Sequence, residues 1–361
     1  MLIPASLVIA IFGGLEPNFA AWGLETIDSI QNELFISSSG LYGEEAQPGK
    51  PPAEPAFTWS VGVMVQALNA ATRARHSYSP FLQHYIEATK VYWNPAGPVA
   101  GYDVLPMPKS PDRYYDDNEW MILAFAESAK VLRSKKPLEL AKSAYRFVMS
   151  GKDSVLGGGV YWREVEKTSK NTCSNGPAAA SALALYEATK DKGYLQTAEE
   201  IYAWTKQHLR DPSDGLYWDN ISLKGNIQNW KFSYNTGLML RTACDLYRFT
   251  KKPEYAGDAR EMQASSLNFW CDKDGSFKDD LKFMPLLLEN WQRAFRYVPN
   301  TADPRPVIKL GLTRMHDEAR DSLGHYGNKC NDKPNGKPYA PFKLIDQASA
   351  ALMYLLAASD K

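Results

Sequence analysis

The sequence lacks an excess of charge of either sign. Its 361 residues include 41 lysines and arginines against 41 aspartates and glutamates, and the two signs are mixed along the chain from Lys50 onward. Without a basic field there is little to attract phosphate backbones or an anionic membrane surface. We therefore expect neither a nucleic-acid partner nor stable insertion into a membrane.

Cysteine and histidine are scarce, with four and five residues respectively. We expect Cys173, Cys271 and Cys330 in loops and Cys244 on a helix, at spacings that match no zinc site. Disulfides and free thiols both remain open. The acidic residues 272–275 lack the ligand count and terminal glutamate of a calcium loop. We predict no metal and no cofactor.

No apolar run is long enough to span a bilayer. Residues 2–15 are apolar and lead to small residues at 20–21, as in a signal peptide, although no lysine or arginine occurs before Lys50. The alternative is a buried first helix. No linker divides the remainder. We predict a leader over residues 1–20, one domain over residues 21–361, secretion and a monomer.

Apolar residues recur with the period of an α-helix over most of the chain, as in the stripe Ile122, Phe125, Ala129 and Leu132. This pattern predicts an all-α protein of about twelve helices. We expect them near residues 23–35, 57–76, 79–93, 116–133, 137–150, 177–190, 194–209, 233–250, 253–270, 280–297, 303–319 and 345–358.

The connections between these helices alternate in length. Short turns are expected at 77–78, 134–136, 191–193 and 251–252, and long segments at 36–56, 94–115, 151–176, 210–232, 271–279 and 320–344. Helices joined by short turns are antiparallel neighbours, so all long loops should lie on one face. A solenoid would show a fixed repeat, which we do not find. We predict a closed (α/α)6 barrel whose loop face forms a bowl.

Two adjacent aspartates, Asp116 and Asp117, begin one of the predicted helices. A single aspartate there can be a helix cap. Two in succession after Tyr114 and Tyr115 fit glycoside hydrolysis, in which one carboxyl protonates the leaving oxygen and the other attacks or activates water. Donated N–H bonds would keep one ionised, and its charge would raise the pKa of the other.

Residues 115–120 (YDDNEW) resemble the aspartate-pair motif of glycoside hydrolase family 76, the endo-α-1,6-mannanases. Further segments similar to the family in order and spacing are residues 158–162, 171–177, 215–219, 234–237 and 346–349. The resemblance implies an (α/α)6 barrel that cleaves α-1,6-mannan internally, with retention, through a covalent mannosyl-enzyme. It also implies Asp116 as nucleophile and Asp117 as general acid/base. Residues 282–285 depart from the family pattern, so no contact is carried over there.

Other residues in these motifs are candidates for binding the sugar. They are Asp219, Trp218, Tyr161, Trp162, Asn175, Asn235, Tyr102 and Asp103. Aromatic rings can stack on sugar faces, and carboxylates and amides can bond to vicinal hydroxyls. The alternatives are packing for the aromatic residues and turn or cap roles for the polar ones.

Three other functions use the same fold. A transglycosylase acting on cell-wall mannan or glycan anchors would use the same aspartates, but the chain ends at Lys361 without the apolar tail of a lipid-anchor signal. A sugar 2-epimerase would use histidine pairs, and only His325 lies clearly in a long loop. An inactive glycan-binding protein would not need Asp116 and Asp117. Hydrolysis of a polysaccharide substrate is therefore preferred.

Overall fold

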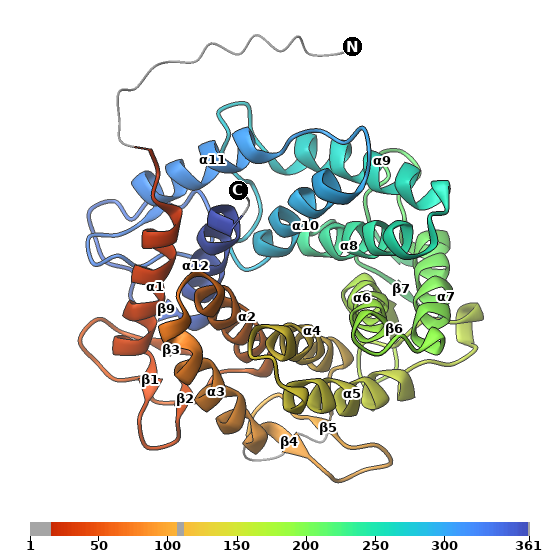
Figure 1. Cartoon of the computed structure of the whole chain (residues 1–361), viewed down its shortest axis with the longest axis horizontal. Helices are drawn as coiled ribbons and strands as arrows, with labels where there is room; N and C mark the ends of the chain where they lie inside the picture. Colours follow the sequence, from red (N-terminus) through yellow and green to blue (C-terminus); the bar gives the residue numbers. More distant parts are fainter. Residues whose placement is uncertain (1–15, 107–111, 360–361) are drawn as a thin grey trace.

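The computed structural model describes residues 16–106 and 112–359. Within these ranges the chain forms twelve α-helices in two concentric rings, as Figure 1 shows. The apolar residues 2–15, predicted to belong to a leader, lie outside the described residues. The first helix begins at Phe19, after Asn18, whose side chain caps it by accepting from the Ala21 N–H.

The even-numbered helices form the inner ring. They are α2 (Thr58–Ala74), α4 (Tyr115–Val131), α6 (Thr172–Thr189), α8 (Ser233–Thr250), α10 (Met284–Tyr297) and α12 (Leu344–Ser359). Each contacts the next, and α12 packs against α2, so the ring closes (Figure 1). The predicted (α/α)6 barrel is confirmed.

The odd-numbered helices surround this ring. They are α1 (Phe19–Glu33), α3 (Ser79–Ala88), α5 (Lys135–Ser150), α7 (Lys192–Leu209), α9 (Pro253–Trp270) and α11 (Arg305–Arg314). The outer helix α1 packs on α12, α5 on α4, and α7 on α6. The last outer helix continues as a π turn over Met315–Ala319.

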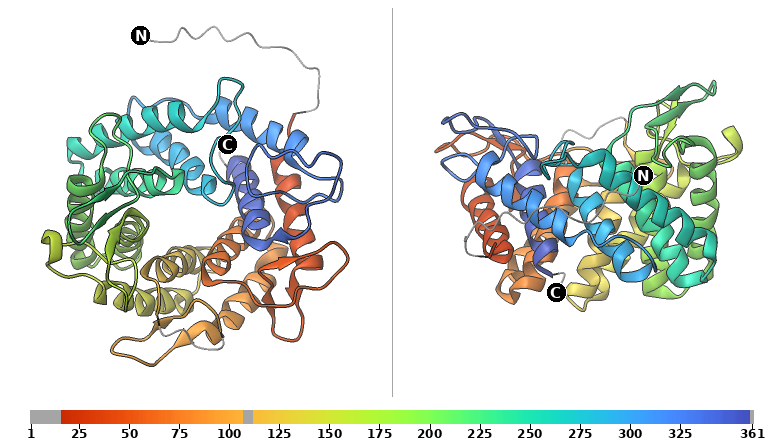
Figure 2. Two further views of the ribbon diagram at one scale, coloured as in Figure 1. Left: turned by 180° about the vertical axis from the view of Figure 1, so that it is seen from behind. Right: turned by 90° about the horizontal axis from the view of Figure 1, so that it is seen from above.

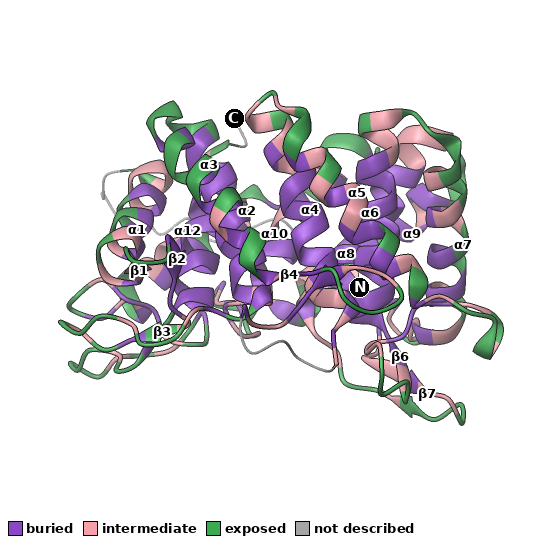
Figure 3. Ribbon diagram, turned by 90° about the horizontal axis from the view of Figure 1, so that it is seen from below, coloured by how far each residue is buried: buried purple, intermediate pink, exposed green. Residues whose placement is uncertain are grey.

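Burial differs between the two rings. On α6 every residue from Thr172 to Leu185 is buried, whereas α5 buries only the face that meets its inner neighbour. Figure 3 shows the inner helices buried over most of their surface. A helix that is buried all round belongs to a core, so the inner ring is a rigid support for whatever its ends carry.

Several predicted helix boundaries differ from the structure by four or five residues, and the one at the start of α6 has consequences for the site. Proline is favoured at the first helical position, which placed the start of a helix at Pro177. In the structure α6 begins at Thr172, and Pro177 lies inside it. Cys173 and Asn175, expected in a loop, are therefore on the inner ring.

The long loops and nine short strands gather at one end of the barrel (Figure 3). The strands are β1 (Phe35–Ile36), β2 (Leu41–Tyr42), β3 (Glu45–Ala46), β4 (Trp93–Asn94), β5 (Gly101–Tyr102), β6 (Ser169–Asn171), β7 (Asn220–Ser222), β8 (Ile227–Gln228) and β9 (Phe342–Lys343). Figure 2 shows the β7–β8 hairpin, in green, projecting from this rim. All six inner helices start here, so their partially positive N-termini converge on one region. We call this the loop end and the opposite one the turn end.

All four cysteines are free thiols. Across residues 16–106 and 112–359, no helix combines the length and the apolar character needed to cross a membrane.

Candidate active site

A cavity of about 680 Å³ opens at the loop end, in the middle of the inner ring. We call it the central cavity. Residues at or next to the starts of all six inner helices line it: Trp59, Ser60, Asp116, Asp117, Cys173, Tyr234, Phe283, Ile345 and Asp346. Its volume lies in the usual range for ligand pockets.

Asp116 is the second residue of α4 and accepts two defined hydrogen bonds. Its Oδ1 accepts from the Asp117 N–H at 3.1 Å, and its Oδ2 accepts from the Trp162 indole N–H at 3.1 Å. Burial raises the pKa of Asp116 to about 6, while bonds from Cys173, Trp162 and the backbone oppose that rise. Asp116 is therefore mostly ionised at neutral pH.

Asp117 has a different environment on the same helical turn. Its carboxyl receives no hydrogen bond from residues 16–106 or 112–359. Burial, and then the charge of Asp116, raise the pKa of Asp117 well above its ordinary value. The two neighbouring carboxyls are thus separated into one that ionises near pH 6 and one that keeps its proton.

A third carboxyl lies one helical turn below Asp116. Glu119 is fully buried, and neither of its oxygens has a hydrogen-bond partner among the described residues. Burial and the charges of Asp116 and Asp117 raise its pKa well above the usual value. A buried carboxyl without a partner is neutral at physiological pH, so Glu119 adds no charge beneath Asp116.

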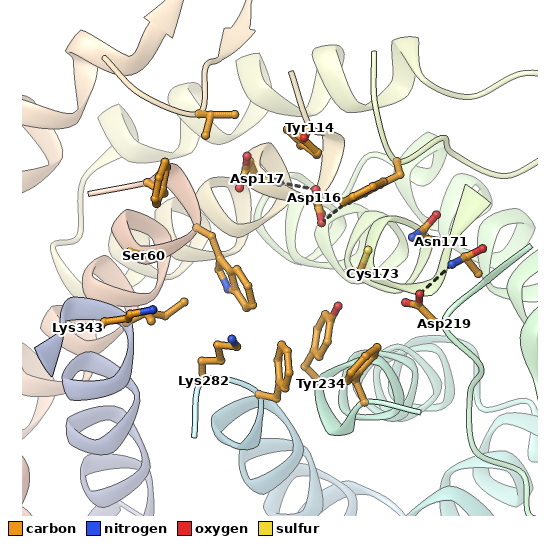
Figure 4. A pocket seen from close by; sticks show the side chains of 18 of the residues that line it. Ser60, Tyr114, Asp116, Asp117, Asn171, Cys173, Asp219, Tyr234, Lys282 and Lys343 are labelled. Atoms are coloured by element: carbon orange, nitrogen blue, oxygen red, sulfur yellow. Dashed lines mark hydrogen bonds between the residues drawn. The ribbon is translucent and has the colours of Figure 1, made fainter. Parts of the chain in front are cut away.

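The aromatic wall of the central cavity faces the carboxyl pair. Phe283 stacks on Tyr234 with ring centroids 4.6 Å apart and on Trp59 at 5.7 Å. In Figure 4 Tyr234 lies across the cavity from Asp116 and Asp117. Such flat apolar faces suit the C–H surface of a sugar ring. Phe283 belongs to the segment that departs from the family pattern, and it nevertheless lines the cavity.

The central cavity carries more acidic than basic side chains. Carboxyls of Glu44, Asp116, Asp117, Asp219 and Asp346 line it, against the ammonium groups of Lys282 and Lys343. Burial raises the pKa of Asp219, and it raises that of Asp346 to about 7 although both lysines oppose the rise. Few of these acids have a basic partner close by.

The loops that reach the central cavity repeat one arrangement six times. Just after each outer helix a residue pairs with one a few positions later: Phe35 with Tyr42, Trp93 with Tyr102, Lys152 with Val160, Arg210 with Tyr217, Cys271 with Phe277, and Arg320 with Tyr326. The residues two positions beyond the second partner are Glu44, Val104, Trp162, Asp219, Asp279 and Asn328. All of these except Asp279 line the central cavity.

This arrangement places three of the predicted sugar-binding residues outside the lining of the central cavity. Asp103, Tyr161 and Trp218 each immediately precede a lining residue, and neighbouring side chains in extended backbone point to opposite sides. The Tyr161 hydroxyl donates to Asp153 and the Trp218 indole to Asp211. Asp103 is buried and accepts from the Asn94 amide. None of the three lines the central cavity.

Three further predicted residues, Asn175, Tyr102 and Asn235, also lie outside that lining. The Asn175 amide accepts from the Val160 N–H and donates to the Val160 carbonyl, and Asn118 makes the same pair of bonds with the backbone of Tyr102. Asn235 is buried on α8, and its amide has no hydrogen-bond partner within the described part of the chain. Asn175, Tyr102 and Asn235 therefore support the loops or the core and do not line the central cavity.

Of the ten predicted site residues, the structure brings Asp116, Asp117, Trp162 and Asp219 together in the cavity. Sequence reasoning missed most of the rest of its lining: Glu44, Trp59, Cys173, Tyr234, Phe283, Asn328 and Asp346. A signal was available for some of them, because Trp59, Cys173 and Tyr234 are, like Asp116, the second residues of their inner helices. Glu44 and Asn328 share the loop position of Trp162 and Asp219.

His325, the histidine considered for epimerase chemistry, is buried away from the cavity. Its Nε2 lies 3.1 Å from Glu33, and its ring stacks on Phe342. No described residue lining the central cavity is a histidine. Among the same described residues, no group of three or more His, Cys, Asp or Glu is placed to hold a metal ion.

The chain matches the sequence model of glycosyl hydrolase family 76 over residues 31–357. Among curated proteins it is similar to the mannan endo-1,6-alpha-mannosidases of Candida glabrata (26% identity, 67% of this chain and 59% of the relative) and Saccharomyces cerevisiae (27% identity, 74% and 63%). The chain thus matches less than two thirds of the length of these relatives.

Solved structures show the same architecture. A GH76 alpha-mannanase of Bacteroides thetaiotaomicron aligns with a TM-score of 0.87 and 29% identity over 95% of this chain and 96% of that one. An inactive variant of an alpha-1,6-mannanase from Salegentibacter sp. HEL1_6, in complex with alpha-1,6-mannotriose, aligns with a TM-score of 0.81 over 95% and 100%. At 24% identity, the second likeness concerns the fold alone.

Proposed function

Because the chain belongs to glycosyl hydrolase family 76, we propose that it is a retaining, endo-acting α-1,6-mannanase. In this proposal Asp116 is the nucleophile and Asp117 the general acid/base. The observation that carries it is a pair of adjacent carboxyls in one cavity with different pKa values. Burial raises the pKa of Asp116 to about 6 and that of Asp117 well above its usual range.

The first step would form a glycosyl-enzyme. Protonated Asp117 gives its proton to the glycosidic oxygen while a carboxylate oxygen of Asp116 attacks the anomeric carbon, so the bond to the leaving sugar breaks and an ester forms. The Trp162 N–H keeps the Asp116 carboxylate oriented for this attack. A nucleophile needs to be ionised and an acid protonated at the same pH, and the two pKa values meet that need.

The second step would release the sugar. The Asp117 carboxylate left by the first step takes a proton from water, whose oxygen attacks the anomeric carbon and displaces Asp116. Two displacements restore the α configuration. Asp117 then holds its proton again, and Asp116 is again a carboxylate.

The central cavity supports a neutral polysaccharide as substrate. Phe283, Tyr234 and Trp59 offer apolar faces, and the unpaired oxygens of Asp219 and Asp346 can accept hydrogen bonds from hydroxyl groups. The names of the relatives favour α-1,6-linked mannose. We also propose that the enzyme is secreted and acts as a monomer on extracellular mannan.

Incubation of the purified protein with debranched α-1,6-mannan tests this function. We expect a ladder of oligosaccharides, which indicates internal cleavage, and a first product with the α anomer, which indicates retention. A β-anomeric first product would contradict the assigned roles, because inversion requires a single displacement by water.

The same experiment separates the alternatives. A transglycosylase would yield products longer than an added acceptor oligosaccharide without a net increase in reducing ends, because transfer replaces each cleaved bond by a new one. A glycan-binding protein would release no products, and its Asp116→Asn and Asp117→Asn variants would bind mannan as well as the wild type does. The hydrolase proposal fails in either case.

A further inference from the structure

A second cavity of about 540 Å³ lies beside the central cavity. We call it the side groove. Glu44 and Phe57 line both cavities, so the two adjoin at these residues. The residues that line the side groove lie in the segment 44–57 and at Leu105 and Pro341, outside the inner helices. Phe57, at the junction, directly precedes α2.

The walls of the side groove are held in place by backbone pairing. One wall is β3, whose Glu45 and Ala46 pair with Lys343 and Phe342 of β9. The other wall is the segment 51–55, which is tied back because Gly43 bridges Pro55 and the Glu44 N–H donates to the Glu54 carbonyl. The groove is therefore preformed, which reduces the ordering cost of binding.

Glu44 also fixes the junction between the two cavities. Its Oε2 accepts from the Phe57 N–H at 3.0 Å and from the Ser60 hydroxyl at 2.8 Å, which caps the start of α2. The Phe57 side chain remains 47% exposed. A large apolar ring held open at the mouth of a cavity suits a ligand with a flat apolar face.

The chemistry of the side groove selects a neutral, hydroxyl-rich ligand. Pro51, Pro55 and Phe57 supply apolar surface, and the carboxylates of Glu45 and Glu54 accept hydrogen bonds. Three glutamates and one lysine line the groove, so an anionic ligand is repelled. A sugar chain combines apolar ring faces with hydroxyl donors and carries no charge.

We propose that the side groove binds the part of the polysaccharide chain that extends beyond the central cavity, and that it thereby makes the enzyme select long substrates. This inference rests on the proposed function for the identity of the sugar. A polysaccharide that occupies both cavities passes Phe57, so its sugar units beyond this residue bind in the side groove.

Calorimetry with linear α-1,6-oligomannosides of increasing length tests the inference. The background is the Asp116→Asn/Asp117→Asn variant, so that no ligand is consumed. We expect the dissociation constant to keep falling after the ligand fills the central cavity, with a total gain of about tenfold, as expected for one or two stacking contacts.

Two substitutions fill the groove from its opposite walls: Ala53→Trp and Gln47→Trp. Both residues are exposed and line only the side groove. In each we expect the ratio of short-ligand to long-ligand dissociation constants to fall from about ten to about one. The matched control is Ala302→Trp, an exposed loop alanine between α10 and α11 at the turn end, which should keep the wild-type ratio.

The inference is overturned if affinity stops rising once the central cavity is filled, or if both filled variants keep the tenfold gain. Its failure is distinct from failure of the proposed function. If the wild type releases no products from mannan, hydrolysis is refuted, and the length dependence of binding still decides whether the groove holds the chain.

Discussion

The two ends of the barrel use acidic residues in opposite ways. At the loop end, Asp116 and Asp117 lie in the central cavity without a basic partner, and burial raises both pKa values. At the turn end, a cavity of about 450 Å³ is lined by acids and bases in close pairs. The inner helices thus begin among unpaired carboxyls and end among ion pairs.

Ion pairing at the turn end favours the ionised form of the acidic side chains. Glu187 accepts from Lys130 at 2.6 Å and from Arg248 at 2.7 Å, and although burial opposes it, these cations lower its pKa to about 2. Arg293 bridges Asp245 at 3.1 Å and Glu289 at 3.3 Å. Basic side chains also complement the partially negative ends of the inner helices.

The contrast gives opposite contributions to stability as pH changes. The folded pKa of Asp116 lies above its unfolded value near 3.8, so its contribution is present below that value and is lost as pH rises through about 6. The folded pKa of Glu187 lies below its unfolded value near 4.5, so its contribution is present above that value and is lost as pH falls toward 2. At neutral pH the ionised Asp116 therefore lowers the stability of the folded protein, whereas Glu187 adds to it. Such a difference is expected if the loop end carries a functional site and the turn end has a structural role.

The largest effect is expected from Asp117→Asn. Loss of the proton donor should lower kcat on α-1,6-mannan by about a thousandfold, because general acid/base catalysis contributes about 10² to 10⁴. Removal of a buried, unpaired carboxyl should leave the melting temperature unchanged or higher. Glu289→Gln at the turn end is the matched control, and we expect near wild-type kcat with lower stability. The distinction between the two ends would be contradicted if Asp117→Asn lost stability but kept its kcat, and Glu289→Gln lost kcat but kept its stability.

Arg293→Met should give the largest loss of stability. It breaks the bridge to Asp245 and Glu289 and leaves both acids without this partner. Breaking a buried ion pair costs about 3 kcal/mol, which denaturant unfolding would measure as a lower midpoint. Since Arg293 lies at the far end of the inner ring, KM for mannan should not change. A raised KM with unchanged stability would contradict a supporting role.

Asn175→Ala tests whether this residue is a clamp or a sugar ligand. The change removes bonds to the Val160 N–H and carbonyl and leaves buried backbone groups unpaired. We expect a loss of about 2 kcal/mol in unfolding free energy. Calorimetry should give a dissociation constant for a short oligomannoside within about twofold of the wild type. Weaker binding without a loss of stability would restore Asn175 as a ligand.

Trp162→Phe keeps the ring and removes the indole N–H that donates to Asp116. We expect kcat/KM to fall about tenfold, since a bond to a charged group is worth about 1.5 to 3 kcal/mol. In the wild type, kcat/KM should rise with pH through about 6 as Asp116 ionises. Loss of a hydrogen-bond donor that favours the ionised carboxylate raises the pKa of Asp116. In the Trp162→Phe variant the rise of kcat/KM, the acidic limb of the pH profile, should therefore move to higher pH. A limb that stays in place would show that the indole does not act on Asp116.

Much of the fold was predictable because its helices are long and strongly periodic. All twelve were placed, and alternation of loop lengths was enough to close the ring. The start of α6 was missed because Pro177 imitates a helix start, and this hid Cys173 among the loop residues. Local signals cannot show that a helix continues upstream of a proline when tertiary packing supports it.

The position of Asp116 and Asp117 at a helix start that lines the central cavity was predictable from their motif, whereas the positions of the loop side chains were not. The extended segments that reach the central cavity contain too few residues to display an alternating pattern, so the sequence did not tell Trp162 from Tyr161 or Asp219 from Trp218. The side groove could not be predicted from the sequence, for another reason. It forms where β3 meets β9, and nearly three hundred residues, 47 to 341, separate the two strands.

Trapping of the covalent intermediate tests the central claim most directly. The protein would be incubated with an activated fluorinated mannoside whose glycosyl-enzyme hydrolyses slowly, then digested and analysed by mass spectrometry. The account predicts one added sugar on the peptide that contains Asp116, and no label in the Asp116→Asn variant. A label on Asp117, or release of product with no labelled peptide at any time, would contradict it.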